Sequence, residues 1–388
     1  MLRISIPYLI TITAAVLLLV IGNKALTGNM AKLSYEPYTI VKAEVREVGE
    51  RIAPNFDFIE DFDDYESFAK IMPGDKILFN AKILSGPRKG ELVTAEQTFS
   101  AQMIDRSKEV ATGDKILLIH NNIAWYFNGY SRINQLIILG IVFVLCLLIF
   151  GGKKGFNTIL SLSFTCIAIF TVFIPAILSG KNIYIMALLV CAYVSAMVPL
   201  IVMGYNKKSL ASILGCIAGV IIAGLITLIM NKALLLTGIA DEHSRYLVRL
   251  PGDIQLDLKA IIFAGIIIGA MGAIMDVSIS ISSALWEIKE KVAAIKFKEL
   301  FRSGINIGRD IMGTMADTLI LAYIGSSLTA VLLLSVASRS LLELFNSEMI
   351  AVEILQALAG SLGILFAMPL TALFCSVVYL TVSAKKDE

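Results

Sequence analysis

Long apolar runs separated by short polar segments make up most of the chain. Seven runs after residue 132 are each long enough to cross a bilayer, which needs about 20 apolar residues. They cover residues 133–150, 158–178, 183–203, 210–230, 260–277, 311–336 and 350–380. An eighth run, 4–21, is too long for the apolar part of a signal peptide and has a poor cleavage site after it. We therefore interpret residues 1–22 as an uncleaved transmembrane anchor, and the pattern predicts about eight transmembrane helices.

Residues 23–132 have a different pattern, with mixed charge and alternation of apolar and polar positions. Period-two alternation is typical of half-buried strands. The expected strands are 38–48, 76–84, 115–120 and 125–127. The string Gly-Asp-Lys-Ile-Leu occurs twice, at 74–78 and 113–117, and each copy reads as a turn that leads into a strand. We predict a small β-rich domain of barrel or sandwich type between the first and second transmembrane helices, with the acidic stretch 57–66 as a solvated loop or short helix.

Lysine and arginine in the short loops predict the orientation, because they accumulate on the cytoplasmic side. One face of the predicted bundle carries Arg3, Lys153, Lys154, Lys207, Lys208, Lys289, Lys291, Lys296, Lys298, Arg302, Arg309, Lys385 and Lys386. The loops of the other face carry only Lys181, Lys232, Arg245, Arg249, Lys259 and Arg339. We therefore expect both termini in the cytoplasm and residues 23–132 outside.

The seven-helix domain, 133–388, has one long cytoplasmic connection, 278–310. Its apolar residues at helical spacing predict an amphipathic helix on the inner membrane surface or against a partner. These residues are Leu285, Ile288, Val292 and Ile295.

Composition supports a membrane protein and argues against several functional classes. Hydrophobic residues make up 57% of the 388 residues, and the net charge of +2 is too small for a nucleic-acid-binding face. All five cysteines lie in apolar runs, and the two histidines are far apart. We therefore expect no metal site, no cofactor and no Ser-His-Asp or Cys-His nucleophile, and we predict that the protein is not an enzyme. The lipid bilayer is the partner that the composition does predict.

Polar chemistry at membrane depth begins in the run that starts at residue 260. Gly265, Gly269, Gly272 and Asp276 are spaced so that all four share one helical face. Glycines on such a face allow a neighbouring backbone to approach closely. We therefore predict helix packing at the three glycines, with a carboxylate at the end of the stripe.

The next run continues this chemistry. Its polar candidates are Asn306, Arg309, Asp310, Thr314 and Asp317, with Gly313 as a further packing glycine. Asp317 lies seven residues, or about 10 Å of helix rise, beyond Asp310, which puts it inside the hydrocarbon. Because the two helices run antiparallel around one connection, we expect Asp276 and Asp317 at similar depth, facing each other.

Three interpretations of these carboxylates compete. Carboxylates that face a small-residue groove suit a proton- or cation-coupled substrate site. Alternatively, Arg309 neutralises Asp310 or Asp276 in a buried polar lock with a structural role. A third interpretation is an aspartyl dyad that shares one proton for intramembrane proteolysis. Glu348 and Glu353 precede the last crossing on the outer side; a helix-start charge explains Glu348, and Glu353 could instead line an outer vestibule.

The longest motifs resemble a known family. Residues 269–284 (GAMGAIMDVSISISSA) and 301–323, which begin FRSGINIGRDIMGTM, resemble the signature of the YibE/F-like family of bacterial membrane proteins. Residues 358–363, 369–371 and the outer segment 86–95 are also similar to its patterns. The resemblance implies the topology derived above and a bacterial plasma membrane. It departs at Asp317, where the family more often has asparagine, and this shifts weight towards Asp276, Asp310 and Arg309.

These patterns favour a transporter- or permease-like protein with an intramembrane polar centre for a small-molecule or ion substrate. The alternative is a scaffold or sensor without transport, whose outer domain binds a partner protein. An intramembrane aspartyl protease is the third candidate.

Overall fold

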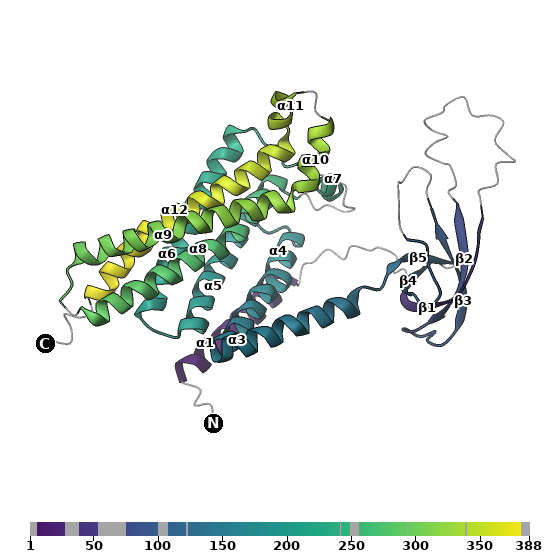
Figure 1. Cartoon of the computed structure of the whole chain (residues 1–388), viewed down its shortest axis with the longest axis horizontal. Coiled ribbons are helices and arrows are strands. Elements are labelled where there is room, and N and C mark those ends of the chain that lie inside the picture. The colour runs from purple at the N-terminus through teal and green to yellow at the C-terminus, as the bar shows by residue number, and fades with distance from the viewer. Residues whose placement is uncertain are drawn as a thin grey trace. The chain divides into compact units, whose positions relative to one another are not determined.

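The computed structural model describes nine stretches of the chain: residues 6–27, 39–52, 75–99, 108–121, 123–240, 242–248, 256–292, 294–337 and 340–381. Contacts divide the chain into two units. One unit comprises residues 34–145 and contains all five described strands, whereas the other comprises residues 1–33 and 146–388 and is helical (Figure 1). Each unit is described by itself.

The strands form a closed barrel in the order β1-β2-β3-β5-β4 (Figure 1). They are β1 (Thr39–Ile52), β2 (Lys76–Ile83), β3 (Leu92–Thr98), β4 (Lys115–His120) and β5 (Trp125–Tyr130). All neighbouring pairs are antiparallel except β3 and β5, which are parallel. A five-stranded barrel with this order and one parallel pair has the topology of an OB-fold. The sequence left barrel and sandwich open, and the structure confirms the barrel.

Alternation explains the barrel core. Val41, Ala43 and Val45 of β1 and Ile77 and Phe79 of β2 point inward and are buried. The sequence missed β3 because its three inward positions, Val93, Ala95 and Gln97, contain only one strongly β-forming residue. Gln97 is nevertheless buried, since its side chain accepts a hydrogen bond from the Val110 backbone N–H (3.0 Å). The acidic stretch 57–66 lies outside the described residues.

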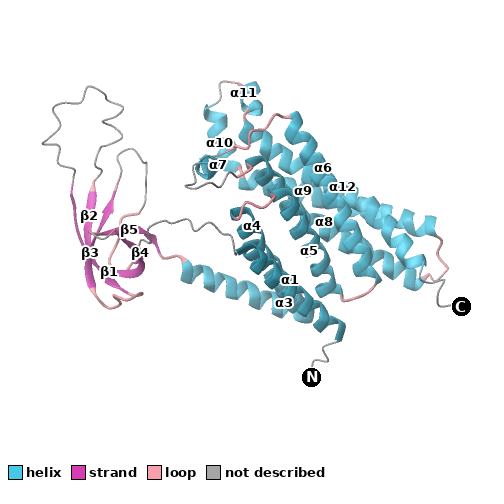
Figure 2. Cartoon of the chain, turned by 180° about the vertical axis from the view of Figure 1, so that it is seen from behind, coloured by secondary structure: helices cyan, strands magenta, loops and turns pink. Residues whose placement is uncertain are grey.

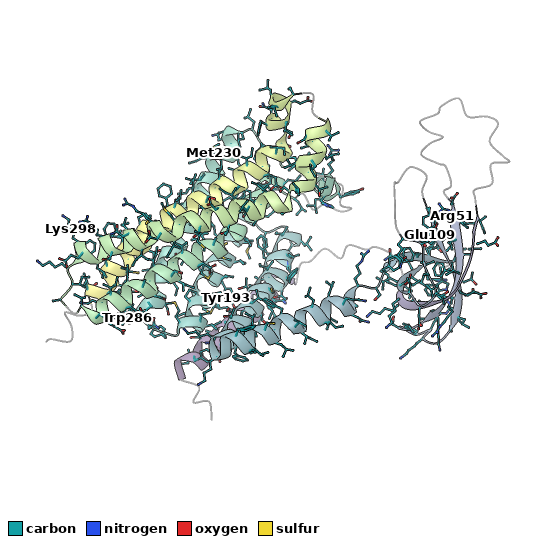
Figure 3. All side chains as sticks on the ribbon, viewed as in Figure 1. Arg51, Glu109, Tyr193, Met230, Trp286 and Lys298 are labelled. Atoms are coloured by element: carbon teal, nitrogen blue, oxygen red, sulfur yellow. The ribbon has the colours of Figure 1, made fainter. Side chains whose placement is uncertain are left out.

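Charged residues on the barrel surface pair with one another. Arg51 contacts both Asp75 and Glu109 at 2.7 Å, and the Arg51–Glu109 pair is labelled in Figure 3. Its guanidinium also lies 4.8 Å from the centroid of the Phe99 ring. These exposed pairs join the end of β1 to the segments beside β2 and β4, and pairs of this kind each contribute at most about 1 kcal/mol.

The second unit, residues 1–33 and 146–388, consists of helices joined by short loops in its described part (Figure 2). Its helices are α1 (Ile6–Thr27), α3 (Ile133–Ile167, which begins in the other unit), η1 (Ala168–Phe173, a π-helical turn), α4 (Ile174–Leu178), α5 (Ile183–Met203), α6 (Lys207–Ala233), α7 (Glu242–Val248), α8 (Leu258–Lys291), α9 (Phe297–Ser326), α10 (Leu328–Ala337), α11 (Leu341–Asn346) and α12 (Glu348–Thr381). Five helical segments among the described residues are long and apolar enough to cross a membrane, or six if the bent pair α9–α10 counts as one crossing. The structure therefore has several of the long apolar helices that the sequence predicts.

The longest of these segments, Ile133–Leu178, is interrupted by a turn. Gly152 has φ 53° and ψ −127°, a backbone conformation outside the helical region. A Cβ on Gly155 would overlap the carbonyl oxygen of Leu147, although these residues would be about 12 Å apart along a continuous helix. The chain therefore folds back at Gly152, between the runs 133–150 and 158–178 that the sequence predicts as separate helices.

The core of the helical unit lies where α6, α8 and α12 pack together, with α5 and α9 against them. At one end of this core the hydroxyl of Ser282 donates to the Lys208 carbonyl (3.1 Å), and the hydroxyl of Tyr379 donates to the Ser282 carbonyl (2.9 Å). Trp286, labelled in Figure 3, stacks edge-on with Tyr379 at this end. The start of α6 and the ends of α8 and α12 therefore meet, and the ammonium groups of Lys207 and Lys208 lie over the Trp286 ring at this end.

The structure differs from the surface helix that the sequence predicts within 278–310. Residues 278–291 continue α8, α9 already begins at Phe297, and the connection between them is only a few residues long. Leu285, which the pattern assigned to an amphipathic surface helix, is fully buried and lies against Gly304 of α9. A helical pattern alone cannot separate an interfacial helix from the extension of a crossing helix, because both present one apolar face.

Candidate functional site

The predicted stripe on α8 lies on one face, but this face is open. Gly265, Gly269, Gly272 and Asp276 are all exposed in the single chain, while Ile266, Ile267, Ile274 and Met275 beside them are buried. The shared face is thus as predicted.

Within the described chain, two of these glycines have no packing neighbour. A Cβ placed on Gly265 or Gly272 would meet no atom within 4 Å. Only Gly269 has a close neighbour, the hydroxyl oxygen of Tyr323 on α9, which would lie 2.5 Å from such a Cβ.

The predicted residues of α9 also lie on an open face. All six are exposed: Asn306, Arg309, Asp310, Gly313, Thr314 and Asp317. The buried residues of α9 are instead Leu300, Gly304 and Gly308. A Cβ on Gly313 would meet nothing within 4 Å, so this glycine too is not a packing position within the chain.

The depth of the two aspartates follows from contacts between α8 and α9. A Cβ on Gly308 would lie 3.3 Å from Ile281 Cδ1, which sets the antiparallel register of the two helices. Asp276, five residues from Ile281, is then level with Gly313, and Asp317 lies about 6 Å further along α9. Asp276 is also near the middle of the 34-residue α8.

The charged candidates have no ionic partners within the described part of the chain. No ion pair within 4.0 Å there involves Asp276, Arg309, Asp310 or Asp317, and no hydrogen bond joins Asp276 to Asp317. The polar lock around Arg309 is therefore not formed within the chain, and the shared proton of an aspartyl dyad has no geometric support there.

Close packing occurs at other glycines, which the sequence reasoning missed. A Cβ on Gly219 of α6 would lie 2.7 Å from both Ala367 Cβ and Ile274 Cγ2, and one on Gly304 would lie 2.7 Å from Ala372 Cβ. Gly360 and Gly363 of α12 are similarly crowded. Gly-x-x-x-Gly spacing occurs at 215–219 and 304–308, but it also occurs at 265–269 on the open face of α8, so the spacing alone does not identify the packed glycines.

Buried hydroxyl groups line the same interface. Thr371 of α12 donates to Ser278 Oγ of α8 (3.2 Å), and Ser278 donates to the Ile274 carbonyl (2.9 Å). Among the described residues, the fully buried Ser212 Oγ of α6 has no hydrogen-bond partner. Most of these hydroxyl groups form hydrogen bonds with one another or with the helix backbone. The interface between α8 and α12 therefore contains polar groups, whereas the charged residues of α8 and α9 lie on the open faces.

A helix break near the start of α12 borders a mainly apolar cavity. α9 and α10 bend by 59° at their junction. A cavity of about 230 Å³ lies beside this junction, and its lining includes Tyr323, Ser327 and Glu353. Glu353 is thus one of the residues that line a cavity, and its place in an outer vestibule stays a prediction.

Glu348 has a different role from Glu353. Its carboxylate accepts hydrogen bonds from the Thr237 N–H (2.8 Å), the Thr237 hydroxyl (2.8 Å) and the Gly238 N–H (2.6 Å). It lies in the first turn of α12, as predicted, but it stabilises the loop after α6. The glutamate therefore fixes the ends of α6 and α12 to each other.

Within the described residues, no group of three or more His, Cys, Asp or Glu side chains is arranged to hold a metal ion. The arrangement offers instead carboxylates, an arginine and hydroxyl groups on helices that can cross a membrane. Groups of this kind bind or relay protons and small ions.

Comparison with known proteins gives one match. A family model described as YibE/F-like protein matches residues 139–381, which include α8, α9 and α12. Among curated proteins and among solved structures, nothing matches the chain.

Proposed function

The chain belongs to the YibE/F-like family, and on that premise we propose that it is a transporter-like, multi-pass protein of the bacterial plasma membrane. Its polar centre consists of Asp276 on α8 together with Asn306, Arg309, Asp310, Thr314 and Asp317 on α9. Asp276 binds or relays the transported proton or cation. The proposal assigns no enzymatic step to these residues.

One observation carries this proposal: among the described residues, Asp276 and Asp317 are exposed and have no ion-pair partner on helices of membrane-spanning character. A charge at the centre of a bilayer costs at least about 2.5–3.5 kcal/mol unless water or a partner group solvates it. Asp276, near the middle of α8, and Asp317 on α9 are therefore too costly to face lipid. They are best accommodated along a hydrated path, which is what a transporter requires.

We further propose eight crossings with residues 23–132 outside and both termini inside. The reversal at Gly152 supports two crossings within 133–178, and α1 and the bent pair α9–α10 supply the seventh and eighth. The orientation is supported by the bundle end where the start of α6 meets the ends of α8 and α12. This end carries Lys207, Lys208, Lys289 and Lys291, and basic residues accumulate on the cytoplasmic side.

Proton flux through purified protein tests the function. Full-length protein is reconstituted into vesicles that contain the pH dye pyranine, and a valinomycin-induced potassium diffusion potential drives protons inward. We expect the wild type to acidify the lumen and Asp276→Asn to fall to the level of protein-free vesicles, because an amide cannot carry the proton.

Glu287→Gln is the matched control. Glu287 is an exposed carboxylate of the same helix, four residues from its basic end, and it should retain full flux. Wild-type flux with an unchanged Asp276→Asn rate would exclude Asp276 as the proton carrier. A wild type that moves no protons would refute the proton-coupled mechanism and favour the scaffold or sensor.

A further inference from the structure

The barrel unit carries a hollow of about 620 Å³ where its last strand leads into α3. The lining comes from the turn before β4, the end of β5 and the first turn of α3. Its charged residues are Asp114, Lys115 and Arg132, and Tyr130 and Gln135 add further polar groups. The hollow therefore presents polar as well as apolar surface.

The hollow lies at the membrane boundary, since α3 has the length and hydropathy of a crossing helix. The apolar run of α3 begins at Ile133, and both Ile133 and Leu136 are exposed. The headgroup layer on each side of the hydrocarbon is about 5–8 Å thick, so Arg132, which directly precedes Ile133, falls within it. The Ser131 N–H donates to the Lys115 carbonyl oxygen (2.8 Å), which keeps Lys115 next to this boundary.

The two cations of the hollow have no counter-charge in the described part of the chain. Neither Lys115 nor Arg132 takes part in an ion pair within 4.0 Å there. The Asp114 carboxylate accepts a hydrogen bond from a backbone N–H of the preceding turn (2.9 Å). Glu44, the register partner of Lys115 on β1, pairs instead with Arg46 (3.1 Å). Positive charge is therefore in excess in the hollow.

A phosphate group attached to hydrocarbon matches this surface. Guanidinium groups bind phosphate oxygens in a bidentate manner, and lysine is a common second ligand. The Gln135 amide offers a further donor, whereas the Tyr130 hydroxyl already donates to the Lys108 carbonyl oxygen (2.6 Å). The exposed side chains of Ile133 and Leu136 continue from the hollow along α3, where acyl chains would lie.

We propose that the hollow binds the phosphate of an anionic glycerophospholipid, with Lys115 and Arg132 as its counter-charges and its acyl chains along the start of α3. The bound lipid holds the end of β5 and the first turn of α3 at the level of the headgroups. This inference rests on α3 as a crossing helix. It does not depend on proton flux or on which side of the membrane the barrel lies, so a failure of the flux assay leaves it unaffected.

Native mass spectrometry of the full-length protein in detergent, titrated with phosphatidylglycerol or phosphatidylcholine, tests this. We expect the wild type to bind one phosphatidylglycerol more tightly than any phosphatidylcholine, because choline cancels the charge of the phosphate. Lys115→Gln/Arg132→Gln should weaken binding of this lipid at least tenfold. Lys76→Gln/Lys89→Gln is the matched control, since both lysines are exposed on the barrel and neither lines the hollow.

Arg132→Gln alone should weaken binding at least threefold, and it provides the test if the double variant loses its thermal transition. Equal wild-type affinity for the two lipids would overturn the proposal. So would unchanged affinity in the folded variants, or an equal loss in the control, which would show that only total charge matters.

Inorganic phosphate distinguishes a lipid headgroup from a free anion. A large excess of it should leave the phosphatidylglycerol bound, because free phosphate lacks the acyl chains that contact α3. Displacement of the lipid would identify free phosphate as the occupant and overturn the assignment to a lipid.

Discussion

Replacing Gly219 by alanine tests whether the α6–α8–α12 core depends on small residues. The added methyl would lie 2.7 Å from Ala367 Cβ and from Ile274 Cγ2, and 3.2 Å from the Gly363 carbonyl oxygen. Ordinary carbon contacts need about 3.5–4.0 Å, so α6 must move away from α12 by several tenths of an ångström. Neither Ala367 Cβ nor the Gly363 backbone can move out of the way by changing rotamer.

The magnitude is obtained by comparison with a second glycine. Insertion of a methyl group into a packed interior costs about 1–3 kcal/mol. Alanine instead of glycine in a helix interior returns up to about 1 kcal/mol. Gly272→Ala, in the middle of α8, has the same helix gain and no atom within 4 Å of its new methyl. The helix term cancels between the two variants, so Gly219→Ala should be less stable than Gly272→Ala by about 1–3 kcal/mol.

Unfolding in mixed detergent and sodium dodecyl sulfate micelles measures this difference. Helical circular dichroism reports the transition of the helical unit for the wild type and both variants. A Gly272→Ala variant that is as unstable as Gly219→Ala would refute the reasoning, because it would show that the open face of α8 is packed as tightly as the core.

Two further variants test single contacts. Glu348→Ala should destabilise the protein by about 1–3 kcal/mol, because it leaves the Thr237 and Gly238 amides without their acceptor. Hydrogen exchange at these two amides should accelerate. Unchanged exchange would show that water replaces the carboxylate. Gly152→Ala should cost about 1–3 kcal/mol, because φ 53° with ψ −127° is unfavourable for any residue with a Cβ, whereas Gly151→Ala next to it should be nearly neutral in the same unfolding assay. Equal stability of these two variants would contradict a reversal fixed by Gly152.

Much of the architecture could be predicted from the chain because the signals are local. Apolar runs such as 183–203 and 210–230 correspond to α5 and α6, and period-two alternation in 38–48 and 76–84 corresponds to β1 and β2. Such patterns reflect which solvent each side chain meets, and this preference is written into consecutive residues. β3 was missed because its inward Ala95 and Gln97 carry little hydrophobic signal.

The candidate site was predicted only in part. Helical spacing placed Gly265, Gly272 and Asp276 on one face, and the structure has them there. The spacing could not show whether another helix covers that face, and in the described chain the face is open. The cavity at Tyr323 and Glu353 was less predictable still, because a bend between α9 and α10 and the start of α12 form it together.

The sequence by itself determined that the protein is built from membrane-spanning helices with a separate β-rich domain, and which residues share a helical face. Hydropathy and periodicity are properties of neighbouring residues, so no tertiary information is needed for either. Only the tertiary structure decided that Gly219 and Gly304 pack while Gly265 and Gly272 do not, and that Glu348 is bonded while Glu353 lines a cavity. Those outcomes depend on how helices far apart in the chain approach one another, and a helix with two small-residue faces can use either one until its neighbours are in place.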